Sequence, residues 1–224
     1  MKRTLIILAD KTFGLTGAPP TDDDFQSRLV EASLKDTVAV CQQVGHSPAA
    51  APAPHLVLAY PDRREWYARI AADFWLLVPQ MGANLAQRLD NLLLFVAPAP
   101  EDETLIVGLR TPQISARDLE HAFIALGQRG ACLGPTAAGG VYALGIRGRW
   151  PTGVLQQVRW HEPAALSGAR RLFRSLRLGL ALLEEREAVV QPTQVCNLIA
   201  DNPAIDRPAT PFLKQLARTV GLSN

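Results

Sequence analysis

The chain has 224 residues, of which 48% are hydrophobic and 20% are charged, and its formal net charge is +2. This length and composition predict one globular domain over residues 1–224 and exclude a chain that is disordered throughout. The near-neutral charge gives no reason to expect nucleic acid as a partner, and the apolar runs are too short for a membrane span.

The first predicted element is a buried strand at Thr4–Ala9. Its apolar stretch is shorter than that of a signal peptide, so we expect a cytoplasmic protein. Cys41, Cys132 and Cys196 are odd in number, far apart and set in apolar stretches. They are therefore predicted to be buried, unreactive thiols of a reducing compartment.

Short apolar runs alternate with longer amphipathic runs along the rest of the chain. This alternation predicts an α/β fold in which helices cover both faces of a mostly parallel central sheet. The predicted strands are Thr4–Ala9, His55–Tyr60, Phe74–Val78, Thr104–Gly108, Ala131–Gly134 and Gly140–Ile146. The predicted helices are Asp24–Val44, Ser115–Gly127 and Pro163–Leu178.

The ends of these helices carry local signals. Asp22, Asp23 and Asp24 are interpreted as a helix start, where negative charge suits the helix dipole. Ser115 is predicted to cap its helix and Gly127 to end it. The polar side of the last helix carries four arginines, Arg170, Arg171, Arg174 and Arg177. They favour a solvated helix face, and the alternative is a surface that docks to a phosphate or an acidic partner.

Ligands of open α/β sheets bind outside the carboxyl ends of the strands, so the segments that follow strands are the candidate sites. The first is the long stretch Asp10–Leu29, where Lys11 and Arg28 are candidates for phosphate contacts. The second is the turn from Pro79 to Leu89. There Gln80 could read a base edge and Arg88 could pair with a phosphate or an internal carboxylate. A simple turn with a helix salt bridge fits the second segment equally well.

Two further segments follow strands, Gly-Leu-Arg-Thr-Pro at 108–112 and Gly-Pro-Thr-Ala-Ala-Gly-Gly-Val-Tyr-Ala-Leu-Gly at 134–145. Together they resemble the paired signature of a bacterial family of candidate glycosyltransferases, a branch of the nucleotide-diphospho-sugar transferases with the GT-A fold. In that family the motifs typically read Gly-Thr-Asp-Ser-Pro and Gly-Pro-Ala-Glu-Asp-Gly-Gly-Tyr-Tyr. The turn at 80–88 is similar to the family's Gln-x-Gly-x-x-Leu-x-x-Arg, and Ile205-Asp206-Arg207-Pro208 resembles its closing Asp-Thr-Pro. The resemblance covers residues 55–215 well and the first 50 poorly.

The departures from the family pattern concern the carboxylates. Arg110 stands where the first motif has aspartate, and Ala138 stands where the second has one. GT-A enzymes normally use such aspartates to hold Mg²⁺ or Mn²⁺ against the donor's diphosphate, so we expect no metal here. The resemblance leaves Asp206 as the one matching carboxylate. It also suggests that the Arg110 guanidinium contacts a diphosphate directly.

The resemblance implies a single-domain GT-A-like protein that acts as a glycosyltransferase on a nucleotide-diphospho-sugar donor and an unknown acceptor, without metal. Two alternatives stay open: a catalytically inactive module that binds a nucleotide or a protein partner, and a nucleotidyltransferase. No catalytic residue can be assigned. The candidate nucleotide- and phosphate-binding residues are Lys11, Arg28, Gln80, Gly82, Arg88, Gly108, Arg110, Gly139, Gly140 and Asp206.

Overall fold

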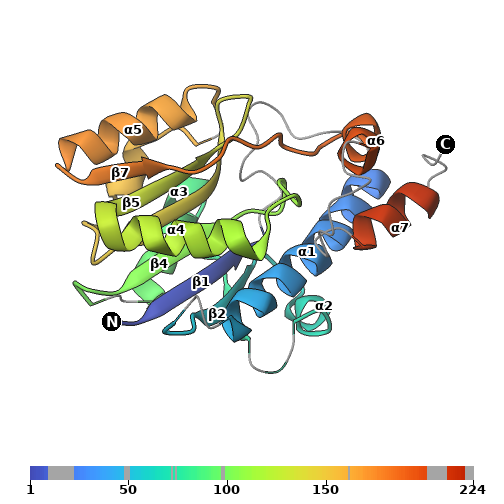
Figure 1. Cartoon of the computed structure of the whole chain (residues 1–224), viewed down its shortest axis with the longest axis horizontal. Coiled ribbons are helices and arrows are strands. Elements are labelled where there is room, and N and C mark those ends of the chain that lie inside the picture. Colours follow the sequence, from blue (N-terminus) through green and yellow to red (C-terminus); the bar gives the residue numbers. More distant parts are fainter. Residues whose placement is uncertain are drawn as a thin grey trace.

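The computed structural model describes residues 1–9, 23–47, 51–71, 73, 75–96, 99–160, 162–200 and 211–219. Among these residues a seven-stranded sheet runs in the order β3-β2-β1-β4-β6-β5-β7 (Figure 1). The strands are β1 (Arg3–Leu8), β2 (His55–Tyr60), β3 (Leu76–Pro79), β4 (Glu103–Val107), β5 (Gly130–Pro135), β6 (Val141–Arg147) and β7 (Gly179–Leu182). The helices are α1 (Asp23–His46), α2 (Arg64–Ala68), α3 (Leu85–Val96), α4 (Ala116–Arg129), the 3-10 helix η2 (Val154–Gln157), α5 (Ala165–Ser175), α6 (Pro192–Ala200) and α7 (Pro211–Thr219).

The sheet is parallel except for one strand. β6 pairs antiparallel with both β4 and β5, whereas the pairs β1–β2, β1–β4, β2–β3 and β5–β7 are parallel. The carboxyl ends of six strands therefore lie at one edge of the sheet, together with the start of β6. The prediction of a mostly parallel α/β sheet is confirmed.

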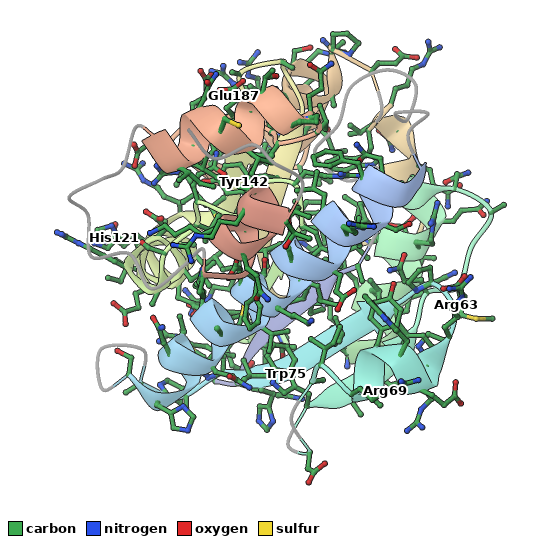
Figure 2. All side chains as sticks on the ribbon, turned by 90° about the vertical axis from the view of Figure 1, so that its right-hand side faces the viewer. Arg63, Arg69, Trp75, His121, Tyr142 and Glu187 are labelled. Carbon is green, nitrogen blue, oxygen red and sulfur yellow. The ribbon has the colours of Figure 1, made fainter. Side chains whose placement is uncertain are left out.

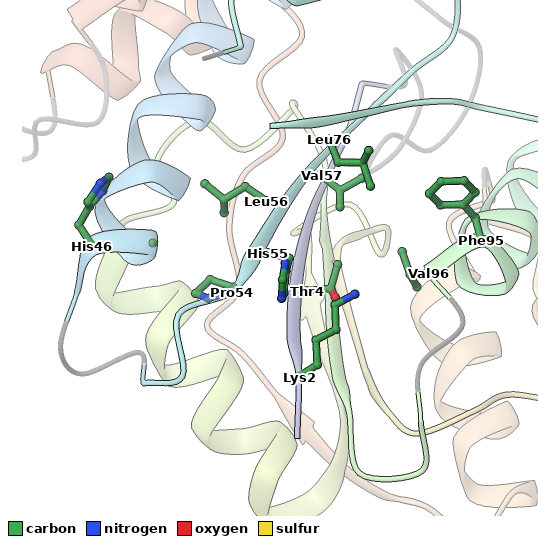
Figure 3. A pocket seen from close by; sticks show the side chains of 11 residues that line it. Lys2, Thr4, His46, Pro54, His55, Leu56, Val57, Leu76, Phe95 and Val96 are labelled. Carbon is green, nitrogen blue, oxygen red and sulfur yellow. The ribbon is translucent and has the colours of Figure 1, made fainter. Parts of the chain in front are cut away.

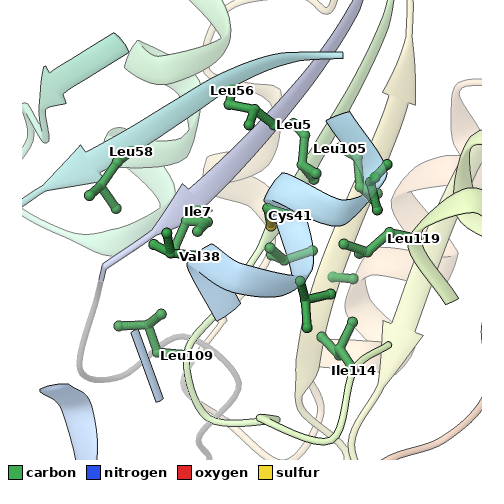
Figure 4. Packing of buried hydrophobic residues seen from close by; sticks show 14 of the residues in the cluster. Leu5, Ile7, Val38, Cys41, Leu56, Leu58, Leu105, Leu109, Ile114 and Leu119 are labelled. Atoms are coloured by element: carbon green, nitrogen blue, oxygen red, sulfur yellow. The ribbon is translucent and has the colours of Figure 1, made fainter. Parts of the chain in front are cut away.

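Helices cover both faces of the sheet. On one face α1 and α4 pack on residues such as Leu5 and Ile7, with Cys41 at the centre of the contact (Figure 4). On the other face α3, η2 and α5 pack on Ile6 and Leu8. Alternate residues of β1 thus serve opposite layers, as strand geometry requires, and both sets are fully buried.

The predicted end of α4 and the predicted start of β3 need correction. Helix α4 does begin behind a capping box of Ser115 and Asp118, but it passes through Gly127 and ends at Arg129, with Gly130 as its C-cap. Gly130 has φ of 85° and its N–H donates to the carbonyl of Leu126, which is the left-handed cap that glycine favours. The third strand begins at Leu76, two residues later than predicted.

Strand β7 was missed in the sequence. Its four residues follow a predicted helix directly and are all small or apolar, a pattern that fits a helix tail as well as a strand. Pairing with β5 decides the conformation, since Gly179 stands opposite Gly130 and Leu182 opposite Leu133.

Helices α6 and α7 form a third cluster with the first half of α1, on the right of Figure 1. Phe25 and Leu29 of α1 belong to this buried cluster together with Val195 of α6 and Leu213 of α7. The carboxylate of Asp36, which is 1% exposed, accepts hydrogen bonds from the backbone N–H groups of residues 212 and 213 at the start of α7. Burial raises the pKa of Asp36 to about 7, an effect that those two hydrogen bonds and Lys214 only partly offset.

The cysteine prediction holds for two residues of three. Cys41 and Cys132 are buried, and burial raises the pKa of Cys132 to about 12, which keeps that thiol protonated. Cys196 is only partly buried, because it lies on α6 at the outside of the third cluster, so the prediction is wrong there.

Helix α5 ends at Ser175, three residues before the predicted end, so Arg177 lies beyond it. Arg170, Arg171 and Arg174 of α5 are exposed, as the predicted solvated face requires, and Arg177 is exposed as well. Within the part of the chain that the structure describes, none of the helices is long and apolar enough to cross a membrane.

Candidate functional site

The segments singled out in the sequence meet at the carboxyl edge of the sheet, the side from which Figure 2 views the molecule. The turn at 80–84 follows β3, and Gly108–Pro112 follows β4. Gly139 and Gly140 precede β6, and because that strand is antiparallel they reach the same edge. Lys11 and Asp206 lie outside the described residues, so the predicted phosphate contact of Lys11 and the predicted place of Asp206 in the nucleotide site stay predictions.

The turn between β3 and α3 is held by its own polar groups. Gln80 is 9% exposed and its Nε2 donates to the carbonyl of Ala59 at the end of β2, over 2.8 Å. Asn84 caps α3 through Oδ1, which accepts from the N–H of Gln87 at 3.0 Å. Gly82 has φ of 142°, and a Cβ there would lie 2.9 Å from the backbone nitrogen of Arg88. The glycine is therefore required by the turn itself, and the buried Gln80 side chain serves to join β3 to β2.

A pocket of about 460 Å³ opens beside this turn, between α1, the end of β2 and α3. Arg28 of α1, Arg88 of α3 and Arg63 of the β2–α2 connection all line it. Arg28 and Arg88 are far apart in sequence and were predicted separately as phosphate-binding residues. The structure brings them to one cavity.

The pocket also carries acidic and aromatic side chains. Asp62 and Glu31 line it, but Glu31 forms an ion pair with Lys35 one helical turn away. Three guanidinium groups and two carboxylates therefore line the pocket, and one of those carboxylates already has Lys35 as its counter-charge. Trp66, which is half-buried, supplies a flat apolar wall and packs edge to face on Tyr67 with ring centroids 4.7 Å apart. The flat face of Trp66 and the positive charge of the guanidinium groups together suit a ligand in which a ring carries phosphate groups.

Arg63 was missed in the sequence, and its backbone is unusual. It has φ of 48° and ψ of 53°, the left-handed region that a residue with a Cβ adopts at a cost of about 1–2 kcal/mol. Strain of this kind is concentrated at functional sites. The signal was available, because residues 61–63 follow the strand His55–Tyr60 and so had to lie at the carboxyl edge.

On the other side of β1, Arg110 has a different environment. Its side chain is 2% exposed and Nη1 donates to Oε1 of Gln26 in the first turn of α1, over 2.8 Å. Gln26 in turn donates to the carbonyl of Val190, and Val189 donates its N–H to the carbonyl of Arg110. The guanidinium therefore ties the end of β4 to α1 and to the segment after β7. A direct contact with a diphosphate stays a prediction, and it requires this cover to move.

The glycine pair before β6 serves the turn rather than an open cleft. Gly139 has φ of 82°, and a Cβ there would lie 2.3 Å from the carbonyl oxygen of Pro163. Gly140 donates its N–H to Oγ1 of Thr136 at 2.9 Å. Gly108, at the end of β4, is buried and donates to the carbonyl of Tyr142. At Gly139 the backbone therefore passes close to the chain before α5.

A second titratable cluster lies next to this turn. Arg186 forms ion pairs with Asp118 at 3.1 Å and Glu184 at 2.7 Å, and Tyr142 donates its hydroxyl to the carbonyl of Glu184. Burial raises the pKa of Tyr142 to about 12, so the phenol stays protonated near neutral pH. These contacts fix the segment after β7 over the edge of the sheet. In Figure 2 this segment, marked by Glu187, and the pocket, marked by Arg63, lie on opposite sides of α1.

The two positions that hold aspartate in GT-A enzymes do not fit a divalent cation in this chain. One carries the buried guanidinium of Arg110, which repels a cation, and the other carries the methyl group of Ala138. In the described ranges no three Asp, Glu, His or Cys side chains come together as a ligand set.

The comparisons with known proteins agree with this architecture. The model of the family DUF2064, described as an uncharacterized protein conserved in bacteria, matches residues 37–162. No curated protein matches the chain. A candidate nucleotide-diphospho-sugar transferase from Desulfovibrio desulfuricans G20 superposes with a TM-score of 0.78 at 16% identity, over 99% of this chain and 97% of that one.

Two enzymes superpose less closely. A 4-diphosphocytidyl-2C-methyl-D-erythritol synthase has a TM-score of 0.58 at 14% identity, over 88% of this chain and 97% of the other. A CMP:2-keto-3-deoxy-manno-octonic acid synthetase in complex with CTP has a TM-score of 0.52 at 12% identity, over 89% and 98%. The fold is therefore that of the nucleotide-diphospho-sugar transferase-like proteins.

Proposed function

The chain belongs to the DUF2064 family of uncharacterized proteins conserved in bacteria, and from that premise we propose that it binds a nucleotide-diphospho-sugar in the pocket of Arg28, Arg63 and Arg88 and transfers the sugar without a metal ion. The observation that carries this proposal is the meeting of three guanidinium groups from three elements at one cavity. Guanidinium groups pair with phosphate oxygens in bidentate geometry and carry a fixed positive charge.

In this proposal the arginines neutralise the charge that develops on the leaving diphosphate, which is the work that a divalent cation does in metal-dependent transferases. The face of Trp66 supports the base or the sugar ring. The fixed turn at Gly82 and the Gln80 side chain hold α3, and with it Arg88, against the pocket.

Nucleotidyl transfer is the second candidate. It is favoured by the fold that this chain shares with a synthetase crystallised with CTP. The two reactions differ in their products, because sugar transfer releases a nucleoside diphosphate and nucleotidyl transfer releases pyrophosphate. An inactive module would bind the same ligands without releasing either product.

The test is a calorimetric titration of UDP, GDP, ADP and CDP in EDTA, on the wild type and on Arg63→Met and Arg69→Met. Arg69 is an exposed arginine of the same region that does not line the pocket, so it is the matched control. We expect at least one diphosphate to bind, with affinity lowered about tenfold in Arg63→Met and unchanged in Arg69→Met. Absence of binding to all four nucleotides, in EDTA and in Mn²⁺ alike, would contradict the proposal.

A further inference from the structure

A second cavity of about 390 Å³ opens at the amino edge of the sheet, at the far end of β1 and β2 from the arginine pocket. The starts of both strands contribute to it through Lys2, Thr4 and His55. The ends of α1 and α3 close two sides, and β3 contributes Leu76 (Figure 3). Its volume is in the range of small-molecule sites.

The titratable side chains that line this cavity are all basic. Lys2, His46 and His55 are its titratable residues, and among the described residues that line it none is Asp or Glu. His46 donates Nδ1 to the carbonyl of Gln42 in its own helix, at 2.7 Å, and so serves the end of α1. Lys2 and His55 are left at the centre of the cavity beside Thr4, as Figure 3 shows, and this group suits a carboxylate or phosphate head.

The rest of the wall is apolar and unusually open. Phe95 is 56% exposed and Leu76 is 51% exposed, although both are large hydrophobic residues and both face the same cavity. Val57 and Val96 continue this surface between them (Figure 3). Exposed apolar side chains that gather around a concave site mark a place where apolar ligand surface is buried.

From this arrangement we propose that the amino-edge cavity is a second binding site, which takes a small amphiphilic anion. The acidic head lies against Lys2 and His55, and the apolar body covers Phe95 and Leu76. The site is separate from the arginine pocket, because β1 and β2 run the full depth of the sheet between them. It does not depend on the transferase proposal.

The experiment is a calorimetric titration with decanoate, held below the concentration at which it forms micelles, and with decyltrimethylammonium, which has the same chain and the opposite charge. We expect decanoate to bind and the cation not to bind. Lys2→Glu and Phe95→Ser should each weaken decanoate binding about tenfold. Met81→Ser, which removes another exposed apolar side chain outside the cavity, should leave it unchanged.

Equal binding of the two amphiphiles, or decanoate binding that survives both cavity variants, would overturn the proposal. Lys2 and Phe95 are exposed, so these variants should fold. Urea unfolding checks this, and Lys2→Gln provides a milder second variant. Nucleotide binding at the opposite edge should persist in all of them.

Two sources share this ligand chemistry, a free amphiphilic acid and the head group of an anionic lipid. Co-sedimentation with phosphatidylglycerol vesicles separates them. Vesicle binding that the Lys2→Glu and Phe95→Ser variants abolish identifies the lipid, and decanoate binding without vesicle binding identifies the free acid. If both variants still bind vesicles and the wild type does not bind decanoate, the proposal that this cavity binds an amphiphilic anion is wrong.

Discussion

Arginine side chains lie on both sides of α1, but their roles on the two sides differ. On the open side Arg28 faces a cavity that it shares with Arg63 and Arg88. On the covered side Gln26 holds the buried guanidinium of Arg110, and Asp36 holds α7. The two sides differ in burial, and burial decides what a charged group does. A buried guanidinium must satisfy its donors within the protein and so becomes a structural tie, whereas a guanidinium on a cavity wall can also contact a bound ligand.

This comparison predicts that variants on the covered side change stability and that variants on the open side change ligand binding. The largest effect is expected for Arg110→Ala. It leaves Oε1 of Gln26 buried without its donor and opens a cavity at the end of β4, which costs about 2–4 kcal/mol of unfolding free energy. Urea unfolding measures this loss.

Arg28→Ala is the control on the open side, and its unfolding free energy should change by less than about 0.5 kcal/mol. In a double-mutant cycle of Gln26→Ala with Arg110→Ala we expect a coupling of about 1 kcal/mol. If Arg110→Ala were as stable as the wild type, the buried arginine would have no structural role, and the two sides of α1 would not differ in this way.

The next effect concerns pH. The pKa of Asp36 is about 7 in the folded protein and 3.8 in a model peptide. The folded state therefore binds more protons than the unfolded state between these values. The contribution to stability is present at acidic pH and is lost as pH rises through 7. From pH 5.5 to pH 8 this single group lowers the unfolding free energy by up to about 2 kcal/mol.

The measurement is urea unfolding of the wild type and Asp36→Asn over that pH range. Asparagine has no proton to lose, so the difference between the two proteins should shrink or reverse as pH rises. Parallel pH profiles would show that Asp36 does not titrate in this range.

The last prediction is a gain in the free energy of unfolding at Arg63, the residue with the strained backbone on the open side. Arg63→Gly relieves the left-handed backbone and should stabilise the fold by about 1 kcal/mol, while it removes one guanidinium from the pocket. Arg63→Ala keeps the strain and loses the same charge. We expect both variants to bind nucleoside diphosphate more weakly and only the glycine variant to unfold at higher urea. Unchanged nucleotide binding in both variants would exclude Arg63 from the site.

The sequence predicted the architecture better than the site. The six predicted strands are present, because apolar runs bounded by turns report directly on burial. The turn of Gln80, Gly82 and Arg88 was located from its residues, and the structure shows that its backbone requires the glycine at position 82. These features depend on local sequence.

What could not be predicted depends on contacts between distant segments. Nothing in the sequence near Arg110 shows that Gln26 will accept from it, or that residues 189 and 190 will cover both. Arg63 gives no local sign of a left-handed backbone, since that conformation is imposed by the tertiary structure. Arg28 and Arg88 were each predicted to contact phosphate, but only the tertiary fold, which brings α1 and the start of α3 to the same edge of the sheet, places them at one cavity.

The most direct test of the central claim is a crystal structure of the protein grown with a nucleoside diphosphate in EDTA. We predict that the phosphate oxygens lie within about 3 Å of at least two of the guanidinium groups of Arg28, Arg63 and Arg88, with Arg110 still bonded to Gln26. A diphosphate bound instead on the covered side, in contact with Arg110 after displacement of residues 189 and 190, would contradict the account.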